Sequence, residues 1–315
     1  MKYQIIYRSI FFVLLVIFCD WLVGATVAHF YRKSRDITIS KIKYTFFDTS
    51  EDVLILGSSR AQHHYIPELL VQGTQFTCFN GGLGGQPLAF SLVQLSKTFE
   101  RYKPKLILLD VTPDFRWDRD SDPRLKVLGP FYRTDTLVKR ILLDNGPRFE
   151  RLKYLSSTFP YNGMLADIVL AYLYVPNVSE SGYIPSPDGL IDSEWQMHEN
   201  EPAFQGIPEK QRFYLKTIVE LCENKGVDLW IVISPLYNTT VGEREISGQV
   251  ADFAADHKVK LMNFSQVLTD HRFFKDHLHL STAGAEMFTS MLRDSISAGN
   301  ESLINNNLED MSLVN

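Results

Sequence analysis

The stretch VLILGSSR, residues 53–60, decides the fold class of this 315-residue chain. Four consecutive apolar residues are typical of a short strand that is buried on both faces, as in a parallel sheet. The glycine and the two serines then end the strand and begin a polar segment. Because ligands of open α/β sheets bind at the carboxyl ends of the strands, we expect a serine hydroxyl at the functional edge of this sheet.

Further apolar runs alternate with segments of helical periodicity along the chain. Helices are expected at 88–102, 209–225, 242–257 and 282–297, and strands at 53–56, 76–79, 106–111, 229–233 and 261–264. Strands that alternate with helices predict a parallel sheet that is covered on both faces. The predicted fold class is therefore α/β, a three-layer α/β/α domain with a parallel five-stranded sheet.

A second segment, DHLHL at residues 276–280, supplies an acid and a histidine three residues apart. A serine hydroxyl becomes a good nucleophile only when a neutral imidazole takes its proton, and a carboxylate holds that imidazole in the required tautomer. The two segments together predict a triad in which Ser59 is the nucleophile, His279 the base and Asp276 the acid. Asp270 is the alternative acid because it lies nearby in the sequence.

A glycine-rich turn, FNGGLGGQP at residues 79–87, follows the second predicted strand. Glycines let the backbone approach a ligand closely and point N–H groups at it, as an oxyanion hole requires. A phosphate-binding loop is the rival interpretation. It is disfavoured because no Gly-Lys-Ser/Thr sequence ends the run and because the turn follows the second strand.

Together these blocks resemble those of the SGNH (GDSL-like) hydrolases, in particular the membrane-anchored branch that handles acyl groups on cell-envelope polymers. The resemblance maps the nucleophile onto Ser59, with Ser58 in place of the family's aspartate, and the base and acid onto His279 and Asp276. The family's Asn-x-Gly-x-x-Gly block corresponds to Asn80, Gly82 and Gly85. The resemblance thereby implies that the backbone N–H groups of Ser59 and Gly85 are oxyanion donors.

The third block of the family, Gly-x-Asn-Asp, has no counterpart after the third predicted strand, where the chain reads LLDVTPD (residues 108–114). The side-chain oxyanion donor is therefore either absent or supplied from elsewhere, with Asn238 as the candidate. Loss of one such donor typically lowers the rate by about 100- to 1000-fold. This departure motivates a hypothesis of another class, a catalytically weak, membrane-tethered accessory protein that binds a glycan or a membrane acyltransferase.

Residues 9–28 form a mostly apolar stretch that follows Lys2 and Arg8. Twenty helical residues span about 30 Å, enough for the core of a bilayer. We expect a retained signal anchor or transmembrane helix within residues 1–30, with the hydrolase domain on the outer side of the membrane. The alternative is a signal peptide that is cleaved after Ala25, and both interpretations export the domain.

Asp20 interrupts this apolar stretch, and a carboxylate near mid-bilayer costs about 2.5–3.5 kcal/mol. Either the span is shifted toward the N-terminus, so that Asp20 lies at the outer interface, or Asp20 meets a polar partner. We expect such a partner on an integral O-acyltransferase.

The remaining sequence is divided by composition. Residues 31–50 read as a charged linker, 51–297 as the hydrolase domain and 298–315 as a disordered tail. Residues 113–207 are rich in aromatics and prolines and are predicted to be an inserted cap at the rim of the sheet. Most of these aromatics are expected to form a small core, whereas Trp117 and Trp195 are candidates for stacking on sugar rings. Arg60, next to the nucleophile, is a candidate for binding an anionic substrate.

Composition excludes several functions. A net charge of −5 carries no signature of nucleic-acid binding, and three cysteines offer no disulfide framework. The histidines lack the carboxylate-histidine pair at helical spacing of common zinc motifs, so neither a metal nor an organic cofactor is expected. The sequence predicts a serine esterase or O-acyltransferase that acts on acyl groups, with O-acetyl expected, of a cell-envelope polysaccharide or related polymer.

Overall fold

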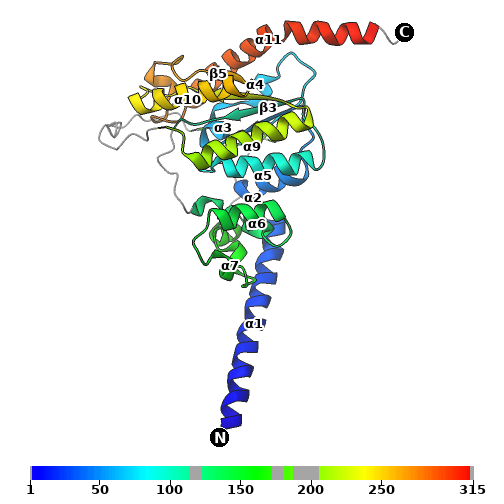
Figure 1. The fold of residues 1–315 in the computed structure, drawn as a ribbon, viewed down its shortest axis with the longest axis vertical. Coiled ribbons are helices and arrows are strands. Elements are labelled where there is room, and N and C mark those ends of the chain that lie inside the picture. Colours follow the sequence, from blue (N-terminus) through cyan, green and yellow to red (C-terminus); the bar gives the residue numbers. More distant parts are fainter. Residues whose placement is uncertain (1, 114–121, 172–179, 187–205, 313–315) are drawn as a thin grey trace. The chain divides into compact units, whose positions relative to one another are not determined.

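The computed structural model describes residues 2–113, 122–171, 180–186 and 206–312 (Figure 1). The chain divides into two compact units. Unit 1 comprises Met1–Asp48, Gly85–Thr98 and Trp117–Asn177, and unit 2 comprises Thr49–Gly84, Phe99–Arg116 and Val178–Asn315. Trp117 and Trp195 both lie outside the described residues.

Unit 2 contains one parallel sheet of five strands in the order β2-β1-β3-β4-β5. The strands are β1 (Val53–Leu56), β2 (Cys78–Asn80), β3 (Leu106–Asp110), β4 (Asp228–Ile233) and β5 (Lys260–Asn263), and each pairs in parallel with its neighbours. The predicted fold class and the predicted number of strands are therefore confirmed.

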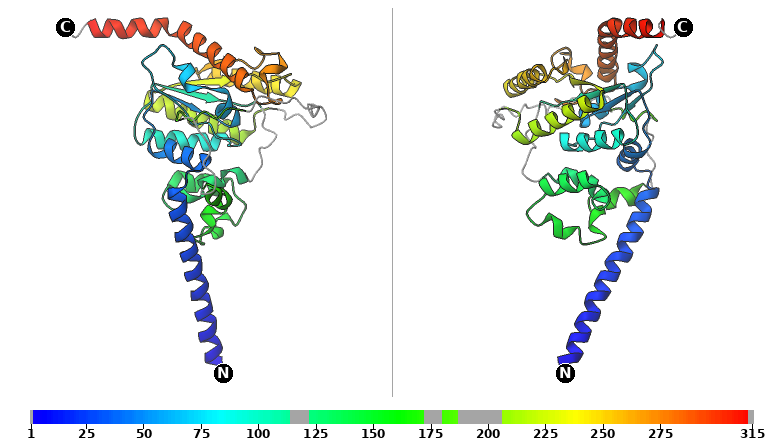
Figure 2. Two further views of the ribbon diagram at one scale, coloured as in Figure 1. Left: turned by 180° about the vertical axis from the view of Figure 1, so that it is seen from behind. Right: turned by 45° about the vertical axis from the view of Figure 1, so that its right-hand side comes forward.

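Helices cover both faces of this sheet (Figures 1 and 2). Val53, Ile55 and Leu108 point to one face, where they pack with apolar residues of α3 (Ser59–His64), α4 (Pro67–Leu70) and α11 (Thr282–Ser312). The alternate residues Leu54 and Leu56 are fully buried on the other face. The helices α9 (Glu209–Lys225) and α10 (Val241–Asp256) precede and follow β4, and Figure 1 shows α9 and α11 on opposite faces. Burial on both faces explains the uninterrupted apolar runs of the strands.

The order in which strands are added to the sheet reverses at β1, because β2 lies on one side of β1 and β3 lies on the other. A reversal of this kind opens a crevice at the carboxyl ends of the strands. Gly57 occupies that point with a φ of 143°, and a Cβ there would lie 2.8 Å from the carbonyl oxygen of Asp110. A glycine is required because any side chain would collide with the last residue of β3.

Unit 1 is helical. It contains α1 (Lys2–Lys33), α2 (Ile37–Phe47), α5 (Leu88–Phe99), η1 (Pro123–Phe131), α6 (Thr136–Asp144), α7 (Glu150–Lys153), η2 (Phe159–Tyr161) and α8 (Leu165–Leu170). Tyr31 and Ile39 of the first two helices form a buried cluster with Met164 and Ile168. The described helices of the predicted insertion thus share a core with the N-terminal helices, while residues 180–186 belong to unit 2.

Two boundaries differ from the prediction. The expected linker at 31–50 contains α2, because Ile39, Ile42 and Phe46 recur at helical spacing and are buried. The expected disordered tail from residue 298 continues α11 as far as Ser312. Residues 300–312 contain neither glycine nor proline, so no residue there ends the helix.

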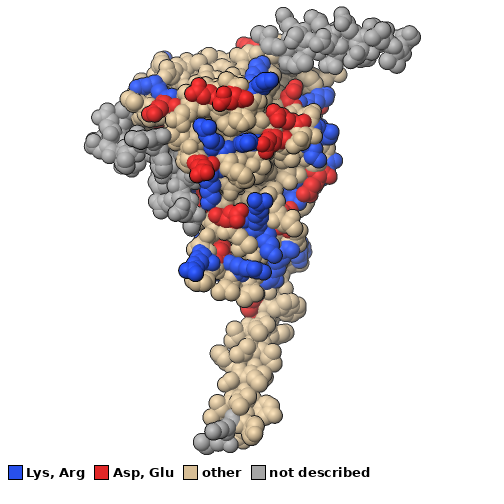
Figure 3. All heavy atoms as spheres, viewed as in Figure 1, with Lys and Arg blue, Asp and Glu red and all other residues tan. Residues whose placement is uncertain are grey.

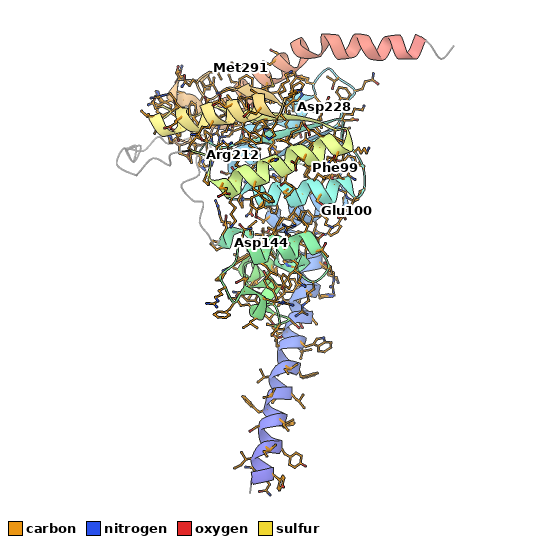
Figure 4. All side chains as sticks on the ribbon, in the orientation of Figure 1. Phe99, Glu100, Asp144, Arg212, Asp228 and Met291 are labelled. Carbon is orange, nitrogen blue, oxygen red and sulfur yellow. The ribbon has the colours of Figure 1, made fainter. Side chains whose placement is uncertain are left out.

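Helix α1 is long and apolar enough to cross a membrane, with a mean hydropathy of 2.5 in its most apolar part. Every side chain from Tyr3 to Cys19 is exposed, and Figure 4 shows them projecting freely from the ribbon. The helix is partly covered only from Asp20 onward, where Gly24 and Tyr31 are buried. The change at Asp20 separates a bare apolar stretch from a stretch that packs against protein.

Candidate active site

Ser59 lies at the start of α3, directly after the turn that ends β1. The strand is fully buried and fixes the backbone of the turn, and the glycine at position 57 lets the chain bend sharply into the helix. The serine hydroxyl is thereby held at the carboxyl edge of the sheet, where the sequence predicted it.

His279 joins this hydroxyl to a carboxylate. Its Nε2 lies 2.8 Å from Ser59 Oγ, and its Nδ1 lies 2.9 Å from both carboxylate oxygens of Asp276. Because Nδ1 faces a carboxylate, it carries the ring proton, and Nε2 is free to accept the proton of the serine hydroxyl. The structure therefore brings together the three residues that the sequence predicted as a triad.

The Asp276 carboxylate is also held by the backbone. Its Oδ1 accepts hydrogen bonds of 2.9 Å from the N–H groups of Leu278 and His279. Burial raises the pKa of Asp276, but the hydrogen bonds from His279 and from the backbone outweigh it and hold the pKa below its ordinary value. The carboxylate consequently stays ionised and can orient and stabilise a charged imidazole.

The hydroxyl of Ser58 is engaged elsewhere, which distinguishes the two adjacent serines. Ser58 Oγ lies 3.2 Å from the Oγ1 of Thr112, in the loop after β3. Ser59, in contrast, has its hydroxyl directed at His279. The geometry favours Ser59 as the nucleophile and leaves Ser58 as a link between the loops after β1 and β3.

The two neighbours that could have replaced triad members have other partners. His277 Nε2 lies 2.9 Å from Glu243 Oε1, at the start of α10. Asp270 pairs with Arg272, and hydrogen bonds from that guanidinium and its backbone lower the pKa of Asp270 to about 2. Among the hydrogen bonds of the described residues, the one to Ser59 Oγ comes from His279 and not from either of these side chains.

A buried network that the sequence did not reveal lies behind the triad. His64 is fully buried, its Nε2 accepts the N–H of Leu280 at 3.0 Å, and its Nδ1 lies 2.9 Å from Ser234 Oγ. Since Nε2 is an acceptor, Nδ1 carries the ring proton and donates a hydrogen bond to Ser234 Oγ. Burial, followed by the charge of Arg60, lowers the pKa of His64 well below its ordinary value and keeps the ring neutral. This contact fixes the residue next to His279.

Arg60 was predicted to bind an anionic substrate, and the structure corrects this. Its side chain is 1% exposed, its Nε and Nη2 donate to Ser234, and its Nε lies 3.9 Å from Asp110. Asp110 also accepts a hydrogen bond of 2.6 Å from Tyr65. Because α3 turns this face toward the sheet, Arg60 supports the site from inside and is not available to a substrate.

The predicted oxyanion donors are located individually, but no hydrogen bond among the described residues joins Gly85 or Asn238 to Ser59. Ser59 belongs to unit 2 and Gly85 to unit 1, where Gly85 has a φ of 71° and a Cβ added to it would meet no atom within 4 Å. Asn80 does not face outward, since its amide donates to the carbonyl oxygens of Ala61 and Tyr65. Asn238 is exposed and has a φ of 46°, a conformation that asparagine tolerates better than most residues. The roles of Gly85 and Asn238 remain predictions.

One described part of the predicted insertion reaches the loops of the site. The carbonyl oxygen of Ile184 lies 2.8 Å from His63 Nδ1, and that of Ser186 accepts a hydrogen bond of 2.7 Å from Thr282. These two contacts hold residues 184–186 beside α3 and the start of α11. The role of the insertion as a cap stays a prediction, and Trp117 and Trp195 lie outside the described residues.

The residues missed by sequence reasoning are His64, Thr112 and Ser234. A usable signal existed for the first, because Arg60 and His64 are four residues apart and therefore share one face of a helix. Ser234 directly follows a predicted strand, and Ser59 lies shortly after another. Its position therefore indicated that Ser234 lies at the same carboxyl edge of the sheet as Ser59.

Comparisons with known proteins concern the fold. No family model matches the chain, and no curated protein matches it. The chain is similar to a structure described as a lipolytic protein of the G-D-S-L family from Desulfitobacterium hafniense, with 12% identity, a TM-score of 0.41, and coverage of 77% of this chain and 97% of that one. It is also similar to one described as a platelet activating factor from Streptococcus pneumoniae (12% identity, TM-score 0.40, coverage 92% and 98%).

A third similar structure is described as an acylhydrolase from Bacteroides fragilis, with 11% identity, a TM-score of 0.40 and coverage of 83% and 94%. At these identities and TM-scores the similarities assign no activity.

Proposed function

We propose that this protein is a membrane-anchored serine esterase or O-acyltransferase of the SGNH type. Its substrates are acyl groups, with O-acetyl expected first, of a cell-envelope polysaccharide or related polymer. The observation that carries the proposal is the continuous series of short hydrogen bonds from Ser59 through His279 to Asp276.

The reaction follows from the roles of these groups. His279 Nε2 takes the proton of Ser59 as Oγ attacks the ester carbonyl carbon, and a tetrahedral oxyanion forms. The protonated His279 then gives that proton to the departing alcohol oxygen, which leaves the acyl group bound to Ser59. Water or a sugar hydroxyl, deprotonated by His279, attacks the acyl-enzyme and restores the free serine. Asp276 stabilises the imidazolium in both halves of the reaction.

The developing oxyanion requires hydrogen-bond donors. We assign this role to the backbone N–H groups of Ser59 and Gly85, with Asn238 as the side-chain donor. Hydrolysis and transfer share the acyl-enzyme and differ only in the acceptor that attacks it. Stacking of Trp117 and Trp195 on sugar rings would favour a carbohydrate acceptor or substrate.

The anchor is proposed to be α1, retained in the mature protein, with unit 2 on the outer side of the membrane. Cleavage after Ala25 would remove Asp20, whose carboxylate accepts hydrogen bonds from residues 156–158 of the same chain. Retention is therefore favoured by the packing of unit 1. N-terminal sequencing of the mature protein tests it: a start at Met1 or Lys2 is expected, and a start at Thr26 would refute the anchor.

These contacts also bear on the partner expected for Asp20. We expected a polar partner on an integral O-acyltransferase, but the hydrogen bonds come from the chain itself, so Asp20 does not require a second protein. The alternative function, a catalytically weak accessory protein that binds a glycan or a membrane-bound O-acyltransferase, rests on the third block alone, where Thr112 stands near the position of the family's asparagine.

The decisive assay is hydrolysis of p-nitrophenyl acetate by the full chain in detergent. The active protein is expected to lose turnover on Ser59→Ala and to keep most of it on Ser58→Ala, the matched neighbour whose hydroxyl faces Thr112. Turnover no faster than in buffer, by a folded protein, would favour the accessory role.

A further inference from the structure

A short loop of unit 1 is fastened to α1 at Asp20. Ser156 Oγ and the N–H of Ser157 each donate to the carboxylate at 2.6 Å, and the N–H of Thr158 donates at 3.3 Å. The hydroxyl of Thr158 also donates to the backbone carbonyl oxygen of Asp20 at 3.2 Å. Four hydrogen bonds thus fix residues 156–158 at one level along the helix.

Two further contacts make this attachment close and rigid. A Cβ at Gly24, one turn after Asp20, would lie 2.6 Å from backbone atoms of Ser157, so only a glycine allows the loop to approach. Arg133 Nη2 donates to the carbonyl oxygens of Tyr154, Leu155 and Ser156. The residues that follow α7 are therefore held next to α1, by the close approach at Gly24 and by the hydrogen bonds from Arg133.

The segment before this loop exposes large apolar side chains. Leu155 is 76% exposed, Phe149 65% and Leu152 60%. Glu150 and Tyr154, in contrast, are buried, and Tyr154 stacks on Tyr132 with ring centroids 3.7 Å apart. The segment consequently turns Glu150 and Tyr154 toward the protein and three large apolar side chains outward, the reverse of an ordinary surface helix.

Basic side chains surround these apolar residues. Residues 148–155 contain Arg148, Arg151 and Lys153 and a single acid, Glu150, a net charge of +2. All three basic side chains are exposed, and Figure 3 shows Lys and Arg gathered where the helical part of unit 1 meets the uncharged stretch of α1. Exposed apolar residues among basic ones are the pattern of a segment that lies on an anionic membrane surface.

The position of the segment along α1 agrees with that pattern. The exposed stretch from residue 3 to residue 19, which is apolar apart from Gln4, Arg8 and Ser9, would span about 25 Å as a helix, close to the thickness of a bilayer core. It ends at Asp20, the residue to which the loop is fastened. The apolar side chains of residues 149–155 are therefore held near the level at which α1 leaves the hydrocarbon.

We propose that residues 148–155 form a second membrane contact, which lies on the bilayer surface beside α1. Phe149, Leu152 and Leu155 enter the region between headgroups and acyl chains, and Arg148 and Arg151 bind the phosphate groups of anionic phospholipids. This inference rests on the proposal that α1 spans the membrane. It gives Asp20 a role, since its hydrogen bonds set the depth of the second contact.

Site-specific fluorescence in vesicles tests this directly. Each variant is the full chain with Cys19→Ala and one added cysteine, at position 152, 12 or 213. The added cysteine is labelled with the environment-sensitive dye NBD. Burial raises the pKa of the Cys78 and Cys222 thiols and slows their labelling, and the Cys19→Ala protein without an added cysteine measures the remaining background. Leu152→Cys is the test, Phe12→Cys reports the span, and Phe213→Cys is the matched control because Phe213 is 54% exposed on α9.

The vesicles contain phosphatidylcholine with or without phosphatidylglycerol. In phosphatidylglycerol vesicles the dye at 152 is expected to emit several-fold more strongly than at 213 and to be quenched by spin-labelled lipid. Arg148→Gln with Arg151→Gln should lower that emission toward its level in phosphatidylcholine alone. If the dye at position 152 emits and is quenched like the dye at position 213, while the dye at position 12 lies in lipid, only the second contact would be overturned. A dye at 12 in water would overturn the anchor and the second contact together.

Discussion

Two aspartates, Asp276 and Asp20, each accept several hydrogen bonds, but their partners lie at very different distances along the chain. The bonds of Asp276 come from Leu278 and His279, two and three residues away. Those of Asp20 come from residues 136 to 138 positions away. The first arrangement is visible as a motif, whereas the second exists only once the chain has folded.

The largest expected effect concerns the local arrangement. His279→Ala should lower kcat for ester hydrolysis by about 10⁵-fold, because both the proton acceptor and the link to Asp276 are lost. His277→Ala, two residues away, loses only the contact with Glu243 and should keep kcat within about threefold. Steady-state kinetics of the two folded variants compares them, and a more damaging His277 change would show that the register of the C-terminal block is wrong.

The distant arrangement is tested by hydrogen exchange. Asp20→Ala removes the acceptor of the Ser157 N–H, whose exchange should speed up by about 10- to 100-fold, the equivalent of about 1.4–2.7 kcal/mol. Asp20→Asn keeps one acceptor oxygen and should show a smaller effect. Mass spectrometry of peptides covering residues 153–159 in detergent provides the measurement. Unchanged exchange in both variants would mean that the loop is not held by Asp20.

His64 has both a local and a distant relation to the site. It is near Ser59 in the sequence, and it accepts a hydrogen bond from the N–H of Leu280, which is 216 residues away. His64→Asn retains a donor near Ser234 but is too short to reach Leu280, whereas His64→Gln can accept that N–H. We expect kcat to fall about tenfold or more in the asparagine variant and less in the glutamine variant, with KM nearly unchanged. Equal losses in both variants would indicate a merely structural role.

Lys41 is a contrasting case, a buried charge for which no hydrogen-bond partner is present among the described residues. Burial lowers the pKa of Lys41 to about 7, so between pH 7 and its ordinary pKa of 10.5 the unfolded chain binds more protons than the folded one. Stability should therefore rise with pH across that window. Lys41→Met should raise the free energy of unfolding at pH 7 by about 1 kcal/mol and flatten this rise, as measured by denaturation in detergent at pH 7 and 10.

The sequence was sufficient for two features that depend on near neighbours. The apolar run before Ser59 predicted β1, and the three-residue spacing in the C-terminal block predicted the pairing of Asp276 with His279. The parallel sheet follows from the alternation of such elements, so the fold class was accessible from the sequence, and so was the pairing of Asp276 with His279.

The remaining features depend on contacts that only the folded chain makes. Arg60 was predicted to meet a substrate because an arginine is usually exposed, but α3 directs it toward Ser234 and Asp110. The linker interpretation of residues 31–50 overlooked the helical spacing of Ile39, Ile42 and Phe46, and the cluster that buries Ile39 is completed by residues near position 164. Charge along the sequence does not reveal which face of a helix will be covered.

Activation of Ser59 as a nucleophile by His279 is tested most directly by covalent labelling. The detergent-solubilised full chain is treated with a fluorophosphonate, digested and mapped by mass spectrometry, alongside His279→Ala. We expect an adduct on Ser59 in the unmodified chain and a strongly reduced adduct in the variant. An adduct on Ser58, or no adduct on a protein that hydrolyses esters, would contradict it.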